Sequence, residues 1–548
     1  MSIEKIKLAA AWLLLAATAT LLRFKVTLNS DTLFLDSLFT DLFQHGGRWT
    51  EWKFVQAPAF VPDMLLYLIA YPLWPDAPGR IFAVSAAQVL LLGAAALWCA
   101  RQVAPQLSRS AQAALLLLLA YVTLTASASG MWFYFYSTNN HLGATMAGLV
   151  GLGLLLRHLA APRWSTALLL VLLIAAAKAS TRLFALTFVT PLVVLAALAL
   201  IALPKQSHLP LRWRRQAWRL LGLLAASQLL ASALEALLIR NIPYEGHAHA
   251  SPETVGNSLK LFMQATAAAF SPSNHWVQAL AIALLLVLGY LLVALLRRLE
   301  LDPAGPALRW PRLGGDLGWR YGAAAALLCV ALPVTVTGSV LSSGFGDLNS
   351  YRYFTFPLTL ACVLAVILLD HHHRRRALAW HVGAVLGAAV IAAGAVQVTR
   401  QQQPNVDMAS SVADCLKAIE AGGFPLKAGI GDYWNGSAIS YYLPRHNPVT
   451  ITTNDTVPMF WVTTLGPLLR PQNYPAHQHY NFALLRDNGA GGQFDYTPDT
   501  IGKLLPPPSR VQACPVDRMQ IWLYDGDQLD TAMARVKADY LARRAARK

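Results

Sequence analysis

The chain has 548 residues, of which 55% are hydrophobic and 13% charged, and its formal net charge is +16. A soluble domain usually carries about 25% charged residues, so this composition excludes an ordinary soluble protein and favours a polytopic membrane protein. The positive charge does not predict nucleic acid as a partner, because membrane proteins concentrate basic residues in their cytoplasmic loops.

Apolar stretches of about 17–25 residues can cross a bilayer, and the chain contains about eleven of them. The first also resembles a signal peptide, and we interpret it as a retained span. The sequence therefore predicts an α-helical polytopic membrane protein with about 11 transmembrane helices. The predicted spans are 7–24, 80–100, 112–129, 142–157, 165–181, 184–203, 217–239, 275–296, 321–340, 354–370 and 378–397.

The basic residues predict the orientation of these spans. With the N-terminal lysines, the links between alternate spans hold 19 Lys or Arg, and the opposite loops hold fewer although they are longer. Because basic loops stay in the cytoplasm, the N-terminus is expected inside. The first external loop, 25–79, and everything after about residue 398 are then expected on the periplasmic side of a bacterial inner membrane.

Two parts of the chain outside the spans are expected to be ordered. In the first external loop, 31–45 is predicted to be a helix that ends at Gly46–Gly47, and the short apolar stretch 60–74 is predicted to lie along the membrane interface. Residues 398–548 are polar and predict a small mixed α/β domain, with a helix at 412–421 and strands at 448–453 and 519–524. The predicted units are thus a membrane module, 1–397, and an external domain, 398–548.

Three aspartates, Asp31, Asp36 and Asp41, follow the first span at intervals of five residues. On a helix this spacing turns successive side chains by about 140°, so the three carboxylates cannot meet at one site. Asp36 and Asp41 are predicted to be solvated charges on the flanks of an apolar stripe. Asp31 falls in the middle of that stripe, where it either caps the helix or serves a site, and we favour the site.

Partners for Asp31 are expected from the other external loops. Lys178 and Arg182 lie four residues apart at the outer end of the fifth span, which predicts that they share one helical face. They either serve a functional site or reach toward lipid headgroups. Together with Arg352, they form a candidate site for a lipid phosphate. Glu235, deep in the seventh span, could face a polar cavity or neutralise a cation. The second external loop adds Asn139, Asn140 and His141 as polar candidates at the mouth of the fourth span.

The cysteines and one aromatic segment leave alternatives open. Three cysteines lie in apolar spans, and Cys415 and Cys514 are the only candidates for a disulfide, paired or free. The segment 431–443, GDYWNGSAISYYL, has side chains suited to stacking on sugars and equally suited to the core of a small domain.

The layout resembles the GT-C superfamily of membrane glycosyltransferases, which includes the aminoarabinose transferases and protein O-mannosyltransferases. The likeness depends on an early acidic residue in the first external loop (Asp31), the interfacial helices, the aromatic second loop and the external C-terminal domain. It also depends on the stretch Arg352, Tyr353 and Pro357 at the entry to a late span.

The resemblance implies transfer of a sugar from a polyprenyl-phosphate donor to a glycan, lipid or protein acceptor. Asp31 would act as general base in a single inverting displacement, and the three cations would bind the donor phosphate. His141, Asn139, Asn140, Tyr351 and Tyr353 would contact substrate. Metal-dependent members place an acidic residue in the second loop, where this chain has the two asparagines and His141, so no cofactor is expected and a divalent metal is not favoured.

Two other kinds of protein fit parts of the pattern. A polyprenyl-linked lipid flippase or transporter predicts interrupted spans in matching halves with charges at the bilayer midplane, and the polar residues here gather at one membrane face. An O-antigen polymerase or ligase fits the large external domain less well. The expected partners are therefore the lipid-linked donor, its acceptor and membrane lipids, and no nucleic acid.

Overall fold

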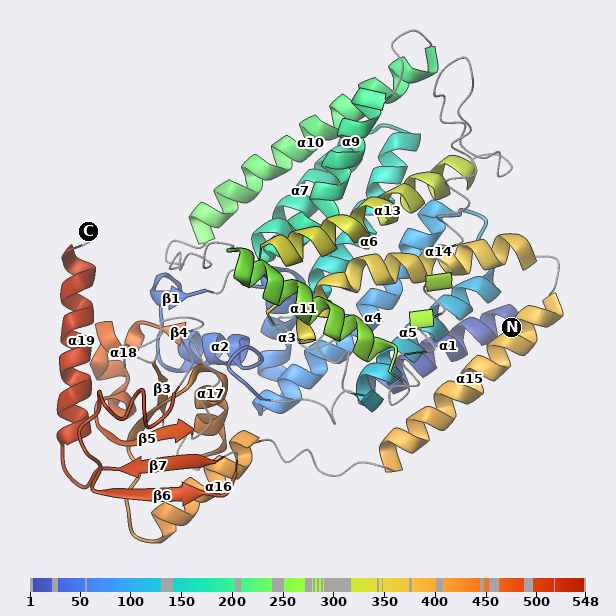
Figure 1. Cartoon of the computed structure of the whole chain (residues 1–548). Helices are drawn as coiled ribbons and strands as arrows, with labels where there is room; N and C mark the ends of the chain where they lie inside the picture. Colours follow the sequence, from blue (N-terminus) through green and yellow to red (C-terminus); the bar gives the residue numbers. More distant parts are fainter. Residues whose placement is uncertain are drawn as a thin grey trace.

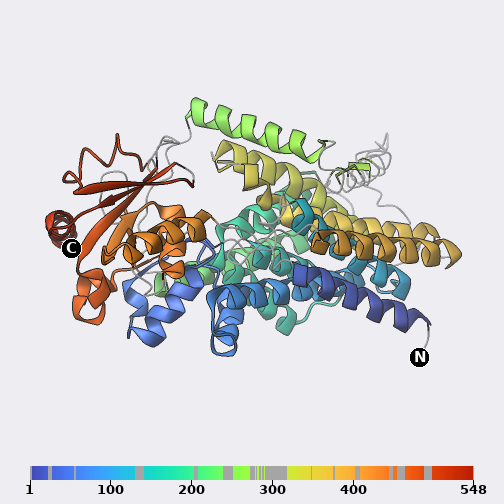
Figure 2. The same ribbon diagram turned by 90° about the horizontal axis from the view of Figure 1, so that it is seen from below.

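The structure is a computed structural model, and it describes most of the chain. The described residues are 3–21, 28–54, 57–129, 141–202, 208–238, 251–271, 317–342, 344–346, 348–373, 377–400, 408–443, 448–452, 463–486, 496–516 and 518–546, with six positions between 278 and 289. A bundle of helices forms the larger part, and a small α/β domain lies at one end of it (Figures 1 and 2).

Most helices of the bundle follow the predicted apolar spans closely, whereas α11 (Pro252–Ala269) lies in the predicted external loop between the spans 217–239 and 275–296. They share one core of buried residues, which alanine and leucine dominate. Small residues let the helices approach closely: an added Cβ at Gly148 would lie 2.6 Å from Phe356, and one at Gly153 would lie 2.1 Å from Trp98. The bundle contains α1 (Ile3–Thr20), α4 (Ala77–Val103), α5 (Arg109–Ser129), α6 (Leu142–Ala160), α7 (Trp164–Ser180), α9 (Thr190–Ala202), α10 (His208–Leu238), α11 (Pro252–Ala269), α13 (Leu317–Leu341), α14 (Thr355–His373) and α15 (Ala377–Arg400).

Seven helices among the described residues are long and apolar enough to cross a membrane, and three shorter apolar helices accompany them. This agrees with a helical membrane protein. The shorter helices include Trp164–Ser180 and Val385–Thr399, which lie in two of the predicted spans. Most of the predicted span 275–296 lies outside the described residues, so the number eleven stays a prediction.

The first external loop folds as predicted in outline, but its helix starts later. Helix α2 runs over Phe34–Gln44, and the π-helical turn η3 (Phe60–Met64) leads into α3 (Leu65–Leu73). The predicted start at Asp31 is wrong: Asn29 and Thr32 bond to each other's backbone through their side chains, and the resulting turn delays the helix. The helix ends at His45, before Gly46 at φ 61°.

The C-terminal domain has a five-stranded sheet in the order β3-β2-β5-β7-β6. Strand β2 pairs in parallel with β3 and with the central strand β5, and β7 pairs antiparallel with β5 and β6. The predicted helix and both predicted strands are confirmed. The elements are α16 (Met408–Ala421), β2 (Ala428–Gly431), α17 (Tyr433–Tyr442), β3 (Val449–Ile451), β5 (Tyr480–Arg486), β6 (Arg510–Cys514), β7 (Met519–Leu523) and α19 (Gln528–Ala546).

The first external loop and the C-terminal domain pack as one body. Their apolar side chains form a single buried cluster, in which Phe34 and Leu38 of α2 join residues such as Leu416 and Ile439. Strand β1 (Trp52–Lys53) of the loop also pairs antiparallel with β4 (Thr463–Thr464) of the domain. Figure 1 shows α2 beside α17 and α18 (Gly466–Leu469), so residues far apart in the chain meet at this junction.

Candidate functional site

Asp31 lies at this junction, in the turn that precedes α2. Residue Leu33 occupies the N-cap position, and no side chain caps this helix. The interpretation of Asp31 as the cap of the helix is therefore wrong. Its carboxylate instead accepts a hydrogen bond from the hydroxyl of Tyr433 at the start of α17. The adjacent Ser30 donates to the backbone oxygen of the same tyrosine and lies 3.1 Å from the hydroxyl of Ser437.

The environment of Asp31 favours its protonated form. Burial raises the pKa of Asp31 above its ordinary value of 3.8, whereas the hydrogen bond from Tyr433 and the charge of Arg352 partly lower it. Burial outweighs these two stabilising contacts, so the carboxylate is more basic than a solvated aspartate. A raised pKa of this kind is typical of a group that accepts a proton in catalysis.

The positive charge of Arg352 links Asp31 to His141, the predicted site residue of the second external loop. Arg352 lies in the 3-10 turn η7 (Leu348–Phe354), beside Tyr353, with the guanidinium 5.6 Å from the centre of that ring. Its positive charge acts on Asp31 and also on His141. The structure therefore places Arg352 where its charge acts on both Asp31 and His141, which the sequence proposed from three separate loops.

His141 is held in one orientation at the start of α6. Its backbone takes the left-handed conformation at φ 70°, and its Nδ1 lies 3.0 Å from the hydroxyl of Thr181. The ring of Tyr353 packs edge-on at 5.8 Å between centroids. Burial, followed by the charge of Arg352, lowers the pKa of His141 to about 3. The imidazole is therefore neutral at physiological pH and can donate or accept one hydrogen bond at each nitrogen.

The carboxylate of Asp63 is buried at the start of α6, close to His141. It was not identified as a site residue from the sequence. Asp63 of η3 is 3% exposed. An added Cβ at Gly143 would lie 3.1 Å from its Oδ2 and 2.5 Å from Pro62, so only glycine fits there. A negative charge is favoured at a helix N-terminus, which explains how this acid is tolerated. The signal was present in the sequence as an acidic residue inside the apolar stretch 60–74.

The C-terminal end of α7 supports η3. The backbone N–H of Ala59 donates to the oxygen of Ser180 at 3.0 Å, and that of Val61 donates to the Ser180 hydroxyl at 3.0 Å. Next to these contacts, Thr181 bonds to His141. The break between α7 and α8 (Arg182–Phe184) thus anchors both the first external loop and the histidine.

This break overturns one prediction about the cations. Lys178 and Arg182 do not share a helical face, because Thr181 is extended, with φ −160° and ψ 130°, and its hydroxyl caps the new helix α8. Arg182 is exposed. The ammonium of Lys178 lies 3.9 Å from the carboxylate of Glu235 on α10, which agrees with the expectation that Glu235 neutralises a cation. Of the three predicted cations, Arg352 is the one whose charge acts on Asp31.

Of the other residues predicted to contact substrate, one packs on His141, one packs on the core of the bundle and two lie outside the described residues. Tyr353 packs on His141, as described, and Tyr351 is half-buried against the apolar core of the bundle. Asn139 and Asn140 lie outside the described residues.

Asp36 and Asp41 are buried, so the prediction of solvated charges is wrong. Asp36 accepts from Arg80 Nε at 2.7 Å and from the hydroxyl of Tyr67 at 2.9 Å. Asp41 accepts from the indole of Trp52 at 2.6 Å and from the hydroxyl of Tyr474. The flanks of α2 face α3 and the C-terminal domain instead of water, and the periodicity of one helix cannot reveal this. Asp41 therefore bonds across the junction to the C-terminal domain, whereas Asp36 joins α2 to α3 and α4.

A polar cluster lies at the carboxyl ends of the parallel strands. The carboxylate of Asp432, directly after β2, lies 3.5 Å from Arg486 Nε at the end of β5. The hydroxyl of Thr452, after β3, lies 2.5 Å from that of Tyr496. Open α/β sheets bind ligands at such strand ends, where neighbouring connections diverge. Asp432 immediately precedes Tyr433, so this edge of the sheet adjoins the residue that bonds to Asp31.

The structure joins Cys415 of α16 to Cys514 of β6 as a disulfide, with 6.0 Å between the Cα atoms.

Among the residues that the structure describes, no group of three or more His, Cys, Asp or Glu side chains is arranged to hold a metal ion. Comparison of the chain with protein-family models gives no match, and neither does comparison with curated proteins.

Proposed function

We propose that this protein is a glycosyltransferase of the bacterial inner membrane, which moves a sugar from a polyprenyl-phosphate donor to an acceptor on the periplasmic face. The observation that carries the proposal is the half-buried carboxylate of Asp31, whose pKa is raised by burial and on which the positive charge of Arg352 acts. A displacement at an anomeric carbon needs both groups: a base for the incoming acceptor and positive charge for the departing phosphate.

The chemical step assigns each group a defined task. Asp31 takes the proton from the acceptor hydroxyl or amine while that atom attacks the anomeric carbon. The bond between this carbon and the phosphate oxygen breaks, and polyprenyl phosphate leaves with the electron pair. Arg352 stabilises the negative charge that develops on the phosphate. A single displacement of this kind inverts the anomeric configuration.

The neighbouring residues have supporting tasks. The hydroxyl of Tyr433 orients the Asp31 carboxylate. Neutral His141 is suited to bind a sugar hydroxyl, because it does not compete with Arg352 as a second charge. The ring of Tyr353 offers an apolar face beside it, and aromatic faces commonly stack on sugars. Metal-independent transfer and the role of Lys178 are proposed on the resemblance alone. Arg182 is exposed and lies beyond the helix break, so it is not included among the proposed phosphate ligands.

The disulfide supports the proposed orientation. Disulfides persist in the periplasm and are rare in the cytosol, where thiols are kept reduced. The Cys415–Cys514 bond therefore favours a periplasmic C-terminal domain, in agreement with the basic residues of the opposite loops. Asp31 packs against this domain, so the same argument favours a periplasmic position for the proposed base.

Replacing Asp31 tests the proposal most directly. In a strain that lacks the chromosomal copy, Asp31→Asn should abolish the change in envelope glycans that the wild-type protein produces, as measured by mass spectrometry. The matched control is Asp414→Asn, because Asp414 is an exposed aspartate of α16 that pairs only locally with Lys417. Full glycan transfer by Asp31→Asn, at equal expression, would contradict the assignment of the base.

A binding experiment tests the phosphate site separately. Purified protein should bind polyprenyl phosphate, and Arg352→Ala and Lys178→Ala should weaken this binding, with the larger effect at Arg352. The control is Arg182→Ala, since Arg182 is exposed and lies beyond the helix break. Unchanged affinity in both the Arg352 and Lys178 variants would refute the phosphate site while leaving the test of Asp31 independent.

A further inference from the structure

A pocket lies at the opposite end of the bundle from Asp31. It is formed between the C-terminal end of α6 and the first half of α10, and it encloses about 300 Å³ including its open mouth. His158 and His141 mark the two ends of α6, and 17 residues of helix at 1.5 Å each separate them by about 25 Å. The pocket is therefore separate from the proposed catalytic site.

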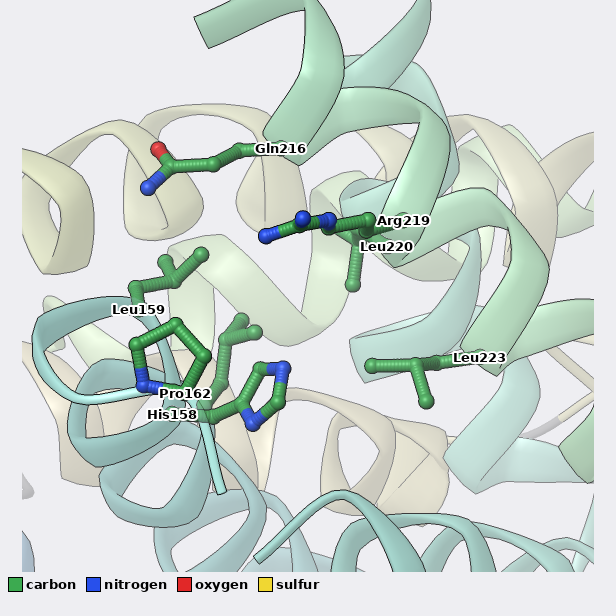
Figure 3. A pocket seen from close by; sticks show the side chains of 8 residues that line it. His158, Leu159, Pro162, Gln216, Arg219, Leu220 and Leu223 are labelled. Atoms are coloured by element: carbon green, nitrogen blue, oxygen red, sulfur yellow. The ribbon is translucent and has the colours of Figure 1, made fainter. Parts of the chain in front are cut away.

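The pocket combines polar groups with an apolar wall. Figure 3 shows the side chains of His158, Gln216 and Arg219 extending into the same space, with leucines of both helices around them. The Nδ1 atom of His158 is shielded from solvent and hydrogen-bonds to no atom within the described part of the chain. A buried nitrogen without a partner is costly, so a bound group that satisfies it would be stabilised.

The surrounding charge selects an anion. Arg157 and Arg163 flank the pocket on one side, and Arg214 and Arg215 precede it on α10. No Asp or Glu occurs from residue 142 to residue 234, so neither α6 nor the part of α10 that lines the pocket supplies a counter-charge. Arg219 offers the planar donor pair that suits a phosphate, and the amide of Gln216 adds a further donor.

Two exposed tryptophans place the mouth of the pocket at the membrane surface. Trp164, at the start of α7, is 79% exposed, and Trp218, next to Arg219, is 64% exposed. Tryptophan gathers at the level of the lipid headgroups, and basic pockets between helices on the cytoplasmic side bind the headgroups of anionic lipids. The leucines below the polar groups would then contact the first part of an acyl chain.

We propose that this pocket binds the phosphate of an anionic phospholipid in the cytoplasmic leaflet. Arg219 and Gln216 hold the phosphate oxygens, and His158 donates or accepts the remaining hydrogen bond. Because the site lies on the far side of the bilayer from the proposed base, a lipid here acts as a structural or regulatory ligand and takes no part in sugar transfer.

Native mass spectrometry of the delipidated full-length protein tests this site. Phosphatidylglycerol should bind at least about tenfold more tightly than phosphatidylcholine with the same acyl chains. Arg219→Gln should weaken phosphatidylglycerol binding about tenfold, the loss expected for one charge-assisted contact. The matched control is Arg215→Gln, which removes an equal charge from an exposed position on the same helix outside the pocket.

Equal losses in the two arginine variants would show a diffuse attraction and overturn the site. If inorganic phosphate alone binds with the same dependence on Arg219 and the lipid does not, the pocket is a soluble-anion site and the lipid proposal is wrong. Leu223→Trp provides a variant without a change in charge: it should fill the pocket and block lipid binding. Unchanged lipid binding in this variant would also overturn the proposal.

Discussion

Tyr433 donates its hydrogen bond to Asp31 across 402 residues of sequence, and this contact joins the C-terminal domain to the first external loop. The hydrogen bond stabilises the ionised carboxylate against its burial. The same contact raises the pKa of Tyr433 well above its ordinary value of 10.0, after the larger effect of burial. The phenol therefore stays protonated and remains a donor throughout the physiological range.

Tyr433→Phe should shift the pH dependence of transfer. Without the phenol, the ionised form of Asp31 loses a stabilising hydrogen bond, so its pKa rises further. Because a general base must be ionised, the acidic limb of the rate should move to higher pH, by about one unit for a hydrogen bond to a charged group. The measurement is donor turnover in proteoliposomes between pH 4 and 8. Tyr480→Phe, on β5, is the control and should leave the limb in place.

Asp31→Asn should stabilise the folded protein at neutral pH. Burial raises the pKa of Asp31 in the folded state, so the folded state holds this proton more tightly than the unfolded state. The contribution of Asp31 to the free energy of unfolding is therefore fully present at low pH. It is lost as the pH rises through the pKa that Asp31 has in the folded state. The variant should therefore unfold a few degrees higher than wild type at pH 7, and the difference should shrink toward pH 4. A lower unfolding temperature at pH 7 would contradict this account of burial.

Arg80→Met should strongly destabilise the packing of α2 on α4. The guanidinium of Arg80 bonds to Asp36 at 2.7 Å, and both side chains are about 10% exposed. Removal of one partner leaves a buried charge, which costs about 3–5 kcal/mol, and the double variant Asp36→Asn/Arg80→Met should recover part of this loss. Denaturant unfolding followed by tryptophan fluorescence measures both. Lys417→Met, in an exposed pair, should cost less than about 1 kcal/mol; a similar cost at both sites would refute the interpretation.

The disulfide can be read directly from unreduced peptides. Protein purified from membranes without reductant should yield one linked peptide that contains Cys415 and Cys514. Cys415→Ser should lower the stability of the domain by about 2–4 kcal/mol. The buried Cys99 and Cys362 should remain unmodified by thiol reagents in the folded protein, because burial keeps reagents away. Free thiols at both external positions would argue against a periplasmic domain.

The sequence predicted the apolar helices and the α/β domain well, because hydrophobic periodicity and length are local properties. It also identified three candidates: Asp31 because it falls on an apolar helical stripe, His141 because it lies at the mouth of a span, and Arg352 because it is a cation at the outer membrane surface. It failed where the partner came from another part of the chain. Asp36 and Asp41 have polar neighbours along their own helix, and only the packing of α2 against α3 and the domain buries them.

Two further misses have the same origin. A helical face for Lys178 and Arg182 assumes an unbroken helix, and the break at Thr181 depends on its side chain capping α8. Tyr433 belongs to the segment 431–443, whose side chains are equally suited to stacking on sugars and to the core of a small domain. Its apolar ring is buried in the shared core while its hydroxyl reaches Asp31, so both descriptions were incomplete.

The shared core of the first loop and the C-terminal domain also constrains how the protein is made. Val84 and Ala409 belong to one buried cluster, yet the ribosome completes the second more than 300 residues after the first. At about 5–20 residues per second, α2 and its neighbours wait roughly 15–60 s for the surface that covers them. Until then the apolar side of α2 has no partner from the domain, and truncated chains that stop before residue 409 should be targets for envelope proteases.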